Sequence, residues 1–239
     1  MHTVKAMERR FEKEDENMTQ MPEQEEAIFV KLGDENSHIP AGKTVIEYEL
    51  SKLVTPDGKR ILAEGIHLKI KGYRKNLYDR SQRGRKNDYF LKKIAEELLN
   101  RNDIKAEYMP QTYEDLLDLD VTPVDYLDKT GDKEERTRIR TYLGSLKYTP
   151  DEMEHPIREL SGGQKAKVLL LRMSLSGANV LILDEPTRNF SPLSGPVIRK
   201  MLREFPGAVI SISHDRKYIE EVCDKIYQLN PNGLQLIGD

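Results

Sequence analysis

The strings Leu160-Ser-Gly-Gly-Gln164 and Leu181-Ile-Leu-Asp-Glu-Pro-Thr187 decide the fold of this chain. Val180–Leu183 is a short, continuous apolar run, which is typical of a central parallel strand covered on both faces. The run places Asp184 and Glu185 at the carboxyl end of that strand, where ligands bind to open parallel sheets. The sequence therefore predicts a ligand site built around these two carboxylates.

Strands and helices alternate after this carboxylate pair. Helical spacing at Pro196–Glu204 is followed by an apolar strand at Ala208–Ser213 and by another helix at Arg216–Val222. Such alternation predicts a parallel sheet with helices on its faces. From about residue 27 to residue 70, short alternating stretches joined by turns predict antiparallel strands instead. One such stretch is Ile28-Phe-Val-Lys-Leu32.

The remaining segments complete the predicted layout. Residues 1–26 are dominated by charged and amide side chains and are expected to form a solvated arm. Apolar spacing predicts a helix at Leu91–Leu99, and Ala106–Pro110 has the pattern of a strand that ends at proline. The region from Asp115 to Leu160 is rich in helical patterns.

Composition limits the functional classes. The chain has 239 residues, of which 33% are charged, and its net charge is -3, so a strongly basic nucleic-acid binder is not indicated. No apolar run approaches the length of a membrane span. The single Cys223 cannot form an internal disulfide, and the amino terminus lacks the apolar core of a secretory signal. A soluble cytoplasmic protein fits these features.

Ser161-Gly-Gly163 has the pattern of a helix start that binds phosphate. It precedes the helical stretch Gln164–Leu175, so Ser161 is a natural N-cap residue, and the two glycines leave backbone N–H groups uncovered.

Four side chains carry candidate chemistry near the predicted sheet edge. In a nucleotide hydrolase, the first carboxylate, Asp184, holds a magnesium ion, and the second, Glu185, accepts a proton from the attacking water. His214 follows an apolar strand, where its imidazole can touch a terminal phosphate. Gln111, after the strand around Tyr108, can reach the metal or the water.

Together these strings resemble the nucleotide-binding domain of ATP-binding-cassette (ABC) proteins, with signature, Walker B, Q-loop and switch histidine in the same order. The resemblance covers residues 27–239 and implies an α/β, P-loop NTPase-like cassette fold. Such a fold has a mainly parallel sheet, an antiparallel β subdomain and a helical subdomain, here at about 112–160. Within the superfamily, three strings are similar to the ABC-F subfamily, cytoplasmic ATPases that act on ribosomes: Gln164-Lys-Ala-Lys167, Asp184-Glu-Pro-Thr-Arg-Asn-Phe-Ser191 and Ser213-His-Asp-Arg216.

The resemblance implies ATP and Mg²⁺ as cofactors and assigns roles to particular residues. Glu185 and His214 would be catalytic, and Asp184 and Gln111 would hold the metal. The implied nucleotide-binding residues are Lys86, Asn87, Gln111, Ser161, Gly162, Gly163 and Gln164.

ABC sites are composite, so the resemblance also implies a partner. The phosphate loop and the Asp-Glu pair of one domain face the Ser-Gly-Gly of another, which requires a second cassette in cis or in a dimer. Residues 1–26 resemble the end of the charged linker that joins two ABC-F cassettes, so the chain is expected to be a second cassette. The ribosome is a further expected partner, and insertion into a membrane is not expected.

Two stretches depart from the family pattern. Asn189-Phe-Ser-Pro192 stands where most relatives carry a leucine-aspartate loop. More seriously, the family predicts Gly-x-x-x-x-Gly-Lys-Ser/Thr shortly after Gly72, and the chain instead reads Lys75-Asn-Leu-Tyr-Asp-Arg-Ser-Gln-Arg-Gly-Arg-Lys-Asn-Asp-Tyr-Phe90. An ungapped alignment puts Lys86 on the phosphate lysine and Asn87 on the magnesium hydroxyl. Three arginines replace glycines, and Asp79 and Arg80 would enter a buried sheet.

We hypothesise that a double frameshift produced the stretch from Lys75 to Phe90, which we call the altered stretch. Ordinary codons for residues 76–90, read one nucleotide later, give the peptide ICMIGHNGAGKTTI, which is an apolar strand followed by a complete phosphate loop. The hypothesis is that two compensating insertions or deletions flank this segment. It is wrong if the shifted frame of the coding DNA does not spell a glycine-rich loop.

The leading interpretation is therefore an ABC-F-type ATPase domain whose ATP hydrolysis is impaired by loss of the phosphate loop. One alternative is the ATPase subunit of a membrane transporter. Another is a non-catalytic truncated remnant. The basic stretch from Lys75 to Phe90 has a further interpretation as a nucleic-acid patch.

Overall fold

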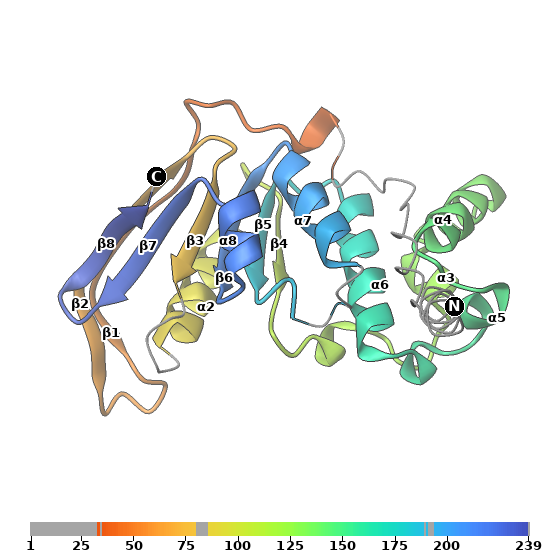
Figure 1. The fold of residues 1–239 in the computed structure, drawn as a ribbon, viewed down its shortest axis with the longest axis horizontal. Helices are drawn as coiled ribbons and strands as arrows, with labels where there is room; N and C mark the ends of the chain where they lie inside the picture. Colours follow the sequence, from red (N-terminus) through yellow and green to blue (C-terminus); the bar gives the residue numbers. More distant parts are fainter. Residues whose placement is uncertain (1–32, 34, 80–85, 189, 191–193, 239) are drawn as a thin grey trace, which may run out of the picture.

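A six-stranded, mainly parallel sheet forms the centre of the molecule (Figure 1). The computed structural model describes residues 33, 35–79, 86–188, 190 and 194–238. The strand order is β4-β5-β6-β3-β7-β8, in which only the last pair is antiparallel. The strands are β3 (Lys75–Asp79), β4 (Ala106–Met109), β5 (Val180–Asp184), β6 (Ala208–Ser213), β7 (Lys225–Asn230) and β8 (Gly233–Gly238).

Alternate residues of the central strands face two different apolar cores. In β5, Val180 and Ile182 belong to the core that contains α2 (Lys86–Leu99), whereas Leu181 and Leu183 belong to the core on the opposite face. That second core is covered by α6 (Gly162–Leu175), α7 (Gly195–Glu204) and α8 (Arg216–Val222) (Figure 1). Every residue of β5 and β6 is buried, as predicted for strands covered on both faces.

An antiparallel pair of strands packs beside this sheet. β1 (Thr44–Val54) and β2 (Ile61–Lys71) form a separate two-stranded sheet. Its inner side chains share the core of α2. The pair also meets the β7–β8 turn, where Glu64 N donates to Pro231 O at 2.8 Å.

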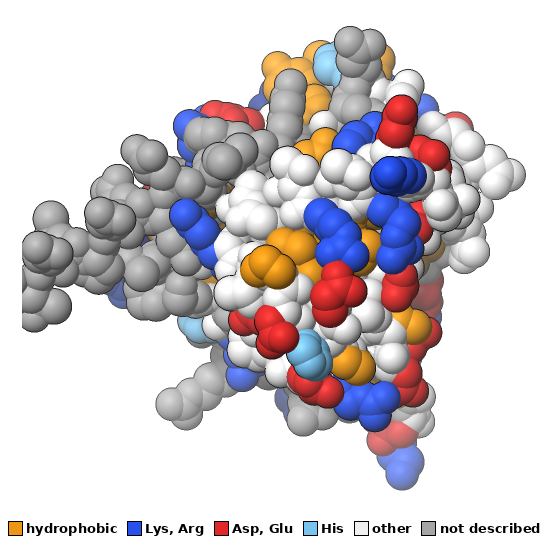
Figure 2. All heavy atoms as spheres, turned by 90° about the vertical axis from the view of Figure 1, so that its right-hand side faces the viewer, with side chains coloured by type: hydrophobic (Ala, Val, Ile, Leu, Met, Phe, Trp, Pro, Cys, Tyr) orange, Lys and Arg blue, Asp and Glu red, His pale blue; other side chains and the backbone are white. Residues whose placement is uncertain are grey.

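Between β4 and β5, the chain forms only helices. Two 3₁₀ turns, Glu114–Leu116 and Ile157–Glu159, flank α3 (Pro123–Leu127), α4 (Lys133–Ser145) and α5 (Pro150–Glu154), and α6 follows. α3, α4 and α5 lie at one end of the molecule (Figure 1), on a face where acidic and basic side chains are intermixed (Figure 2).

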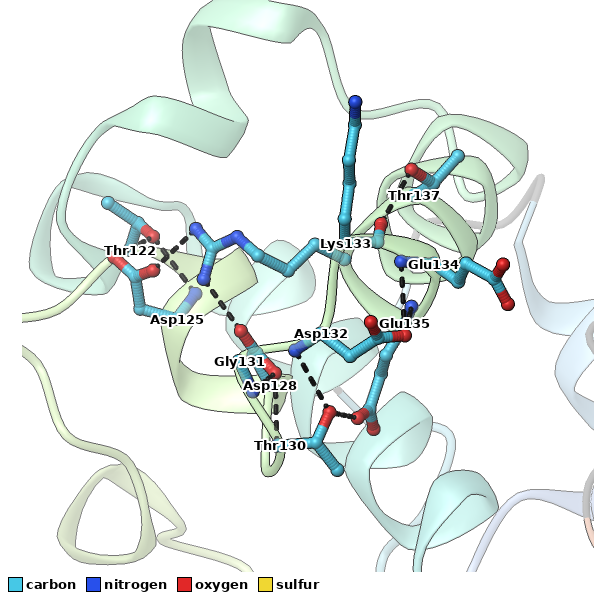
Figure 3. Close-up of polar contacts among 11 residues, drawn as sticks. Thr122, Asp125, Asp128, Thr130, Gly131, Asp132, Lys133, Glu134, Glu135 and Thr137 are labelled. Carbon is cyan, nitrogen blue, oxygen red and sulfur yellow. Dashed lines mark hydrogen bonds and ion pairs between the residues drawn. The ribbon is translucent and has the colours of Figure 1, made fainter.

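A polar network joins α3 to α4 (Figure 3). Arg136 of α4 donates to Asp125 and Asp128, in both cases at 2.7 Å. Asp128 also accepts from the backbone N–H of Gly131, and Asp132 caps the first turn of α4. The Arg136 contacts therefore fix the turn and both helices as one unit.

The altered stretch provides the central strand β3, between β6 and β7. Leu77 and Tyr78 are fully buried, one in each core. Asp79 ends the strand opposite Ser213, and Arg80, together with the arginines at 83 and 85 and Gly84, lies outside the described residues.

Lys75 is buried at the start of β3, at the edge of the sheet opposite to the carboxyl ends of its parallel strands. Its ammonium donates to the carbonyls of Tyr73, Phe205 and Gly207 at 2.9, 2.7 and 3.3 Å. Burial lowers the pKa of Lys75 to about 8, although the nearby Asp224 carboxylate opposes this shift.

The predicted helices and strands are confirmed where the structure describes them, with some shifted ends. β1 and β2 lie in the region where antiparallel strands are predicted, and α2 begins at Lys86 rather than Leu91, inside the altered stretch. The β7–β8 hairpin was not predicted. The predicted charged arm at residues 1–26 and the predicted strand Ile28–Leu32 lie outside the described residues.

Candidate functional site

Asp184, the last residue of β5, and Glu185, which follows it, are buried side chains at the carboxyl edge of the sheet. Asp184 is 6% exposed and Glu185 is 3% exposed. Glu185 takes a left-handed backbone conformation, with φ at 54°, and its N–H donates to Ile212 O of the neighbouring strand at 2.9 Å. Because β-carbon crowding disfavours this conformation, the backbone at Glu185 is strained.

The Glu185 carboxylate is held by the last residue of β6 and by the residue that follows it. Ser213 Oγ donates to Glu185 Oε2 at 3.3 Å, and His214 Nδ1 lies 2.7 Å from Glu185 Oε1. The His214 side chain is 67% exposed, whereas that of Glu185 is 1% exposed. The predicted catalytic pair is therefore in direct contact, with the imidazole between the buried carboxylate and solvent.

A second contact ties the loop after β5 to the start of α8. Thr187 Oγ1 donates to Asp215 Oδ2 at 2.8 Å. Asp215 in turn accepts from the N–H groups of Lys217 and Tyr218 at the first turn of α8. These bonds position the segment that follows Glu185.

A cavity of about 620 Å³ lies beside Asp184, bounded by the first turns of α2 and by the ends of β4 and β5. Gln111 and Asp184, the two predicted metal residues, both line it. The complete lining consists of Asp88, Tyr89, Lys92, Tyr108, Pro110, Gln111, Thr112, Asp115, Asp184 and Arg188.

Tyr108 presents a neutral hydroxyl-bearing ring to this cavity. Burial raises the pKa of Tyr108 to about 12, and the carboxylates of Asp184 and Asp88 add to the shift. The phenol therefore stays protonated at neutral pH.

Lys86 and Asn87 lie elsewhere on α2 and are absent from the cavity lining. Lys86 Nζ donates to the carbonyl of Leu229, in β7, at 2.5 Å, and burial lowers the pKa of this lysine. Asn87 is 1% exposed. Neither of these two predicted phosphate residues lines the cavity, and the contact of Lys86 is with β7.

Ser161 caps α6 as predicted. Its hydroxyl accepts from Gln164 N at 3.3 Å, and Gln164 Oε1 accepts from Ser161 N at 2.8 Å, which completes a capping box. Gln164 Nε2 also donates to Glu152 of α5 at 2.5 Å. Ser161 and Gly162 are exposed, and Gly163 is partly exposed. None of the four predicted residues from Ser161 to Gln164 lines the cavity.

Sequence reasoning missed two cations in the cavity lining, Lys92 and Arg188. Asp88 and Lys92 are four residues apart, which places them on one face of a helix, but the first turn of that helix lies within the altered stretch. Arg188 stands within the string Asp184–Ser191, which indicates the family but assigns no role to this arginine.

Within the described residues, no group of three or more His, Cys, Asp or Glu side chains could hold a metal ion. The same residues include no helix that is both long and apolar enough to span a membrane.

The family described as ABC transporter matches residues 38–188 of the chain. This match covers more than half of the sequence and includes β1 to β5, Gln111, the capped start of α6 and the carboxylate pair. The chain therefore belongs to the ABC transporter family.

Curated relatives share modest identity over parts of the chain. The putative ATP-binding protein YdiF of Bacillus subtilis is 36% identical over 102 residues, which is 42% of this chain and 16% of that protein. The probable ATP-binding protein YheS of Escherichia coli K12 is 29% identical over 187 residues, 75% of this chain and 29% of that protein. ABC transporter F family member 5 of Arabidopsis thaliana is 26% identical over 59% of this chain and 20% of that protein. The chain thus spans less than a third of each of these relatives.

A solved structure shares the fold. A dimeric post-hydrolysis state of the ATP-binding cassette MJ0796, bound to ADP and Pi, has a TM-score of 0.65 at 17% identity. The structural alignment covers 81% of this chain and 98% of the MJ0796 chain. The chain has the ABC cassette fold, as predicted.

Proposed function

We propose that this chain is an ABC-F-type cassette that binds ATP with Mg²⁺ in the cavity beside Asp184. The observation that carries the proposal is that Gln111, just after β4, and Asp184, at the end of the neighbouring β5, line one cavity next to the buried Glu185. The names of the relatives, ATP-binding proteins and F family members, support the same assignment.

The oxygen donors of the cavity fit Mg²⁺. This ion is commonly held by one or two carboxylates together with substrate phosphates, which agrees with a site that has few protein ligands. Asp184 and the Gln111 carbonyl would hold it, and when bound it would neutralise charge on the phosphates.

Glu185 would act as the base that accepts a proton from the attacking water. Ser213 and His214 hold its carboxylate in place, and the exposed side of the imidazole faces solvent, where a terminal phosphate could lie. The His214 contact thus links the proton acceptor to the expected phosphate position.

Hydrolysis by this chain would be severely impaired. Phosphoryl transfer depends mainly on positioning and on charge neutralisation around the phosphates. The altered stretch carries no glycine-rich loop, and the contact of Lys86 with Leu229 directs that lysine toward β7.

The expected partners are a second cassette and the ribosome. The exposed start of α6 at Ser161 and Gly162 would face the ATP site of the second cassette. The dimeric ABC cassettes that share the fold support this pairing. The assignment to ribosomes rests on the ABC-F resemblance, and co-sedimentation of the chain with ribosomes rather than membranes tests it.

Thermal unfolding tests the binding proposal. A ligand that binds only the folded state at a hundred times its dissociation constant adds about 2.7 kcal/mol of stability, which corresponds to a rise of roughly 5–10 °C in a domain of this size. ATP with Mg²⁺ should produce such a rise. An unchanged melting temperature at millimolar ATP would instead support a non-catalytic remnant.

Turnover measurements test the impairment. The purified chain should release phosphate from ATP no faster than its Glu185→Gln variant. Robust turnover that this substitution abolishes would show that the impairment proposal is wrong.

A further inference from the structure

Two cationic side chains from distant parts of the sequence line the cavity beside Asp184. Lys92 lies on α2, and Arg188 follows the buried carboxylates of β5. Both residues are exposed, so their charged groups can reach a ligand in the cavity. Within the part of the chain that the structure describes, neither side chain forms an ion pair.

The neighbouring basic residues are committed to other contacts. Lys86 donates to the Leu229 carbonyl at 2.5 Å, and Lys93, the residue after Lys92, pairs with Glu96 at 2.7 Å. Among the residues that the structure describes, Lys92 and Arg188 are therefore the basic residues that line the cavity.

The same lining contains the carboxylates of Asp88, Asp115 and Asp184. An anionic ligand would meet repulsion from these groups unless a cation lies between them and the ligand. A cavity that combines carboxylates with two available cations therefore suits an anion that arrives together with a divalent cation. A nucleoside polyphosphate with Mg²⁺ has this chemistry.

We propose that Lys92 and Arg188 bind the polyphosphate of the nucleotide and supply part of the charge neutralisation that a phosphate loop normally provides. This proposal rests on the proposed function. The guanidinium of Arg188 can donate two parallel hydrogen bonds to phosphate oxygens, and the ammonium of Lys92 contributes a compact charge. Charge-assisted bonds of this kind are stronger than neutral ones.

The test measures the affinity of the full chain for ATP, tripolyphosphate and adenosine by titration calorimetry with Mg²⁺ present. Lys92→Ala and Arg188→Ala should each weaken ATP and tripolyphosphate binding roughly tenfold, as expected for loss of a charge-assisted contact in a partly exposed site. Adenosine affinity should change less than about twofold, because adenosine carries no phosphate.

Lys93→Ala and Arg138→Ala serve as matched controls. Lys93 is adjacent to Lys92 on the same helix, Arg138 is an exposed arginine of α4, and neither lines the cavity. Both controls should bind ATP as the parent chain does. Melting temperatures without ligand should agree among all variants, so that a folding defect is not mistaken for lost binding.

The outcomes separate this proposal from the proposed function. If the parent binds ATP and the Lys92 and Arg188 variants bind it equally well, the assignment of these cations is wrong while the ATP-binding proposal stands. If the parent binds neither ATP nor tripolyphosphate, both proposals are wrong. If the control variants lose as much ATP affinity as the Lys92 and Arg188 variants, the loss reflects general surface charge, and the assignment is wrong.

Discussion

At the scale of single residues, Glu185 combines a strained backbone with a buried charge. Its φ of 54° lies in a region that residues with a β-carbon adopt at a cost of about 1–2 kcal/mol. Its N–H bond to Ile212 O and the side-chain bonds from Ser213 and His214 hold it in this conformation. Such strain is commonly retained where it places a functional group.

Replacing Glu185 by glycine and by alanine separates the backbone strain from the side-chain contacts. Both variants lose the same carboxylate, but only glycine adopts the left-handed region without crowding. We expect Glu185→Gly to be more stable than Glu185→Ala by about 1 kcal/mol, the reverse of the usual order in helices and strands. Urea unfolding of the two variants measures the difference. Equal stability, or a more stable alanine variant, would show that the backbone is unstrained.

At the scale of elements, the sequence predicts the helices and strands that have a simple local pattern of residues. β5 and β6 are continuous apolar runs and α6 has a capped start, so each could be recognised locally. Local rules failed for β3, because the charged Asp79 argued against a central strand although Leu77 and Tyr78 fill both cores. Tertiary packing decided this element.

The candidate site was only partly predictable for a related reason. Gln111, Asp184, Glu185 and His214 stand in recognisable strings, and their order along parallel strands places them at one edge of the sheet. Lys92 and Arg188 stand in no such string, and only the folded chain shows that they line one cavity. Lys86, assigned by ungapped alignment, lies beside β7.

The element from β3 to α2 can be rebuilt to test whether its altered sequence limits binding. Replacing residues 76–89 by ICMIGHNGAGKTTI restores backbone amides, a lysine and a hydroxyl around the phosphates. We expect ATP affinity to rise at least about tenfold, since several charge-assisted bonds are regained. Calorimetric titration of ATP into both chains measures this gain. An unchanged affinity in a variant that unfolds cooperatively would show that the altered stretch is not the limiting feature.

At the scale of the whole molecule, the exposed start of α6 offers a surface for pairing. Gly162 begins this helix without positive φ, and a β-carbon added there would meet no heavy atom within 4 Å. A large side chain at this position should therefore leave the chain folded while filling the space that a partner needs.

Gly162→Arg is expected to prevent ATP-dependent pairing with a second cassette without changing the melting temperature of the unliganded chain by more than about 2 °C, because surface substitutions away from packed features are usually nearly neutral. Light scattering of the chain with and without ATP measures the pairing. Gly58→Arg, at an exposed turn, is unsuitable as a control because Gly58 has a positive φ. Gly42→Arg has open space and no such constraint, so it provides the control. Unimpaired pairing by Gly162→Arg would contradict the role given to this helix start.

The buried ammonium of Lys75 determines how β3 aligns with its neighbouring strands. Three carbonyls converge on this one group, and a slide of β3 by one residue would replace it with Arg74 or Asn76, neither of which offers three donors on a compact tip. A slide would also exchange Leu77 and Tyr78 between the two cores. Lys75 thus fixes the register of the central strand from the first residue of the altered stretch, so the sheet can keep its alignment while the sequence that follows diverges.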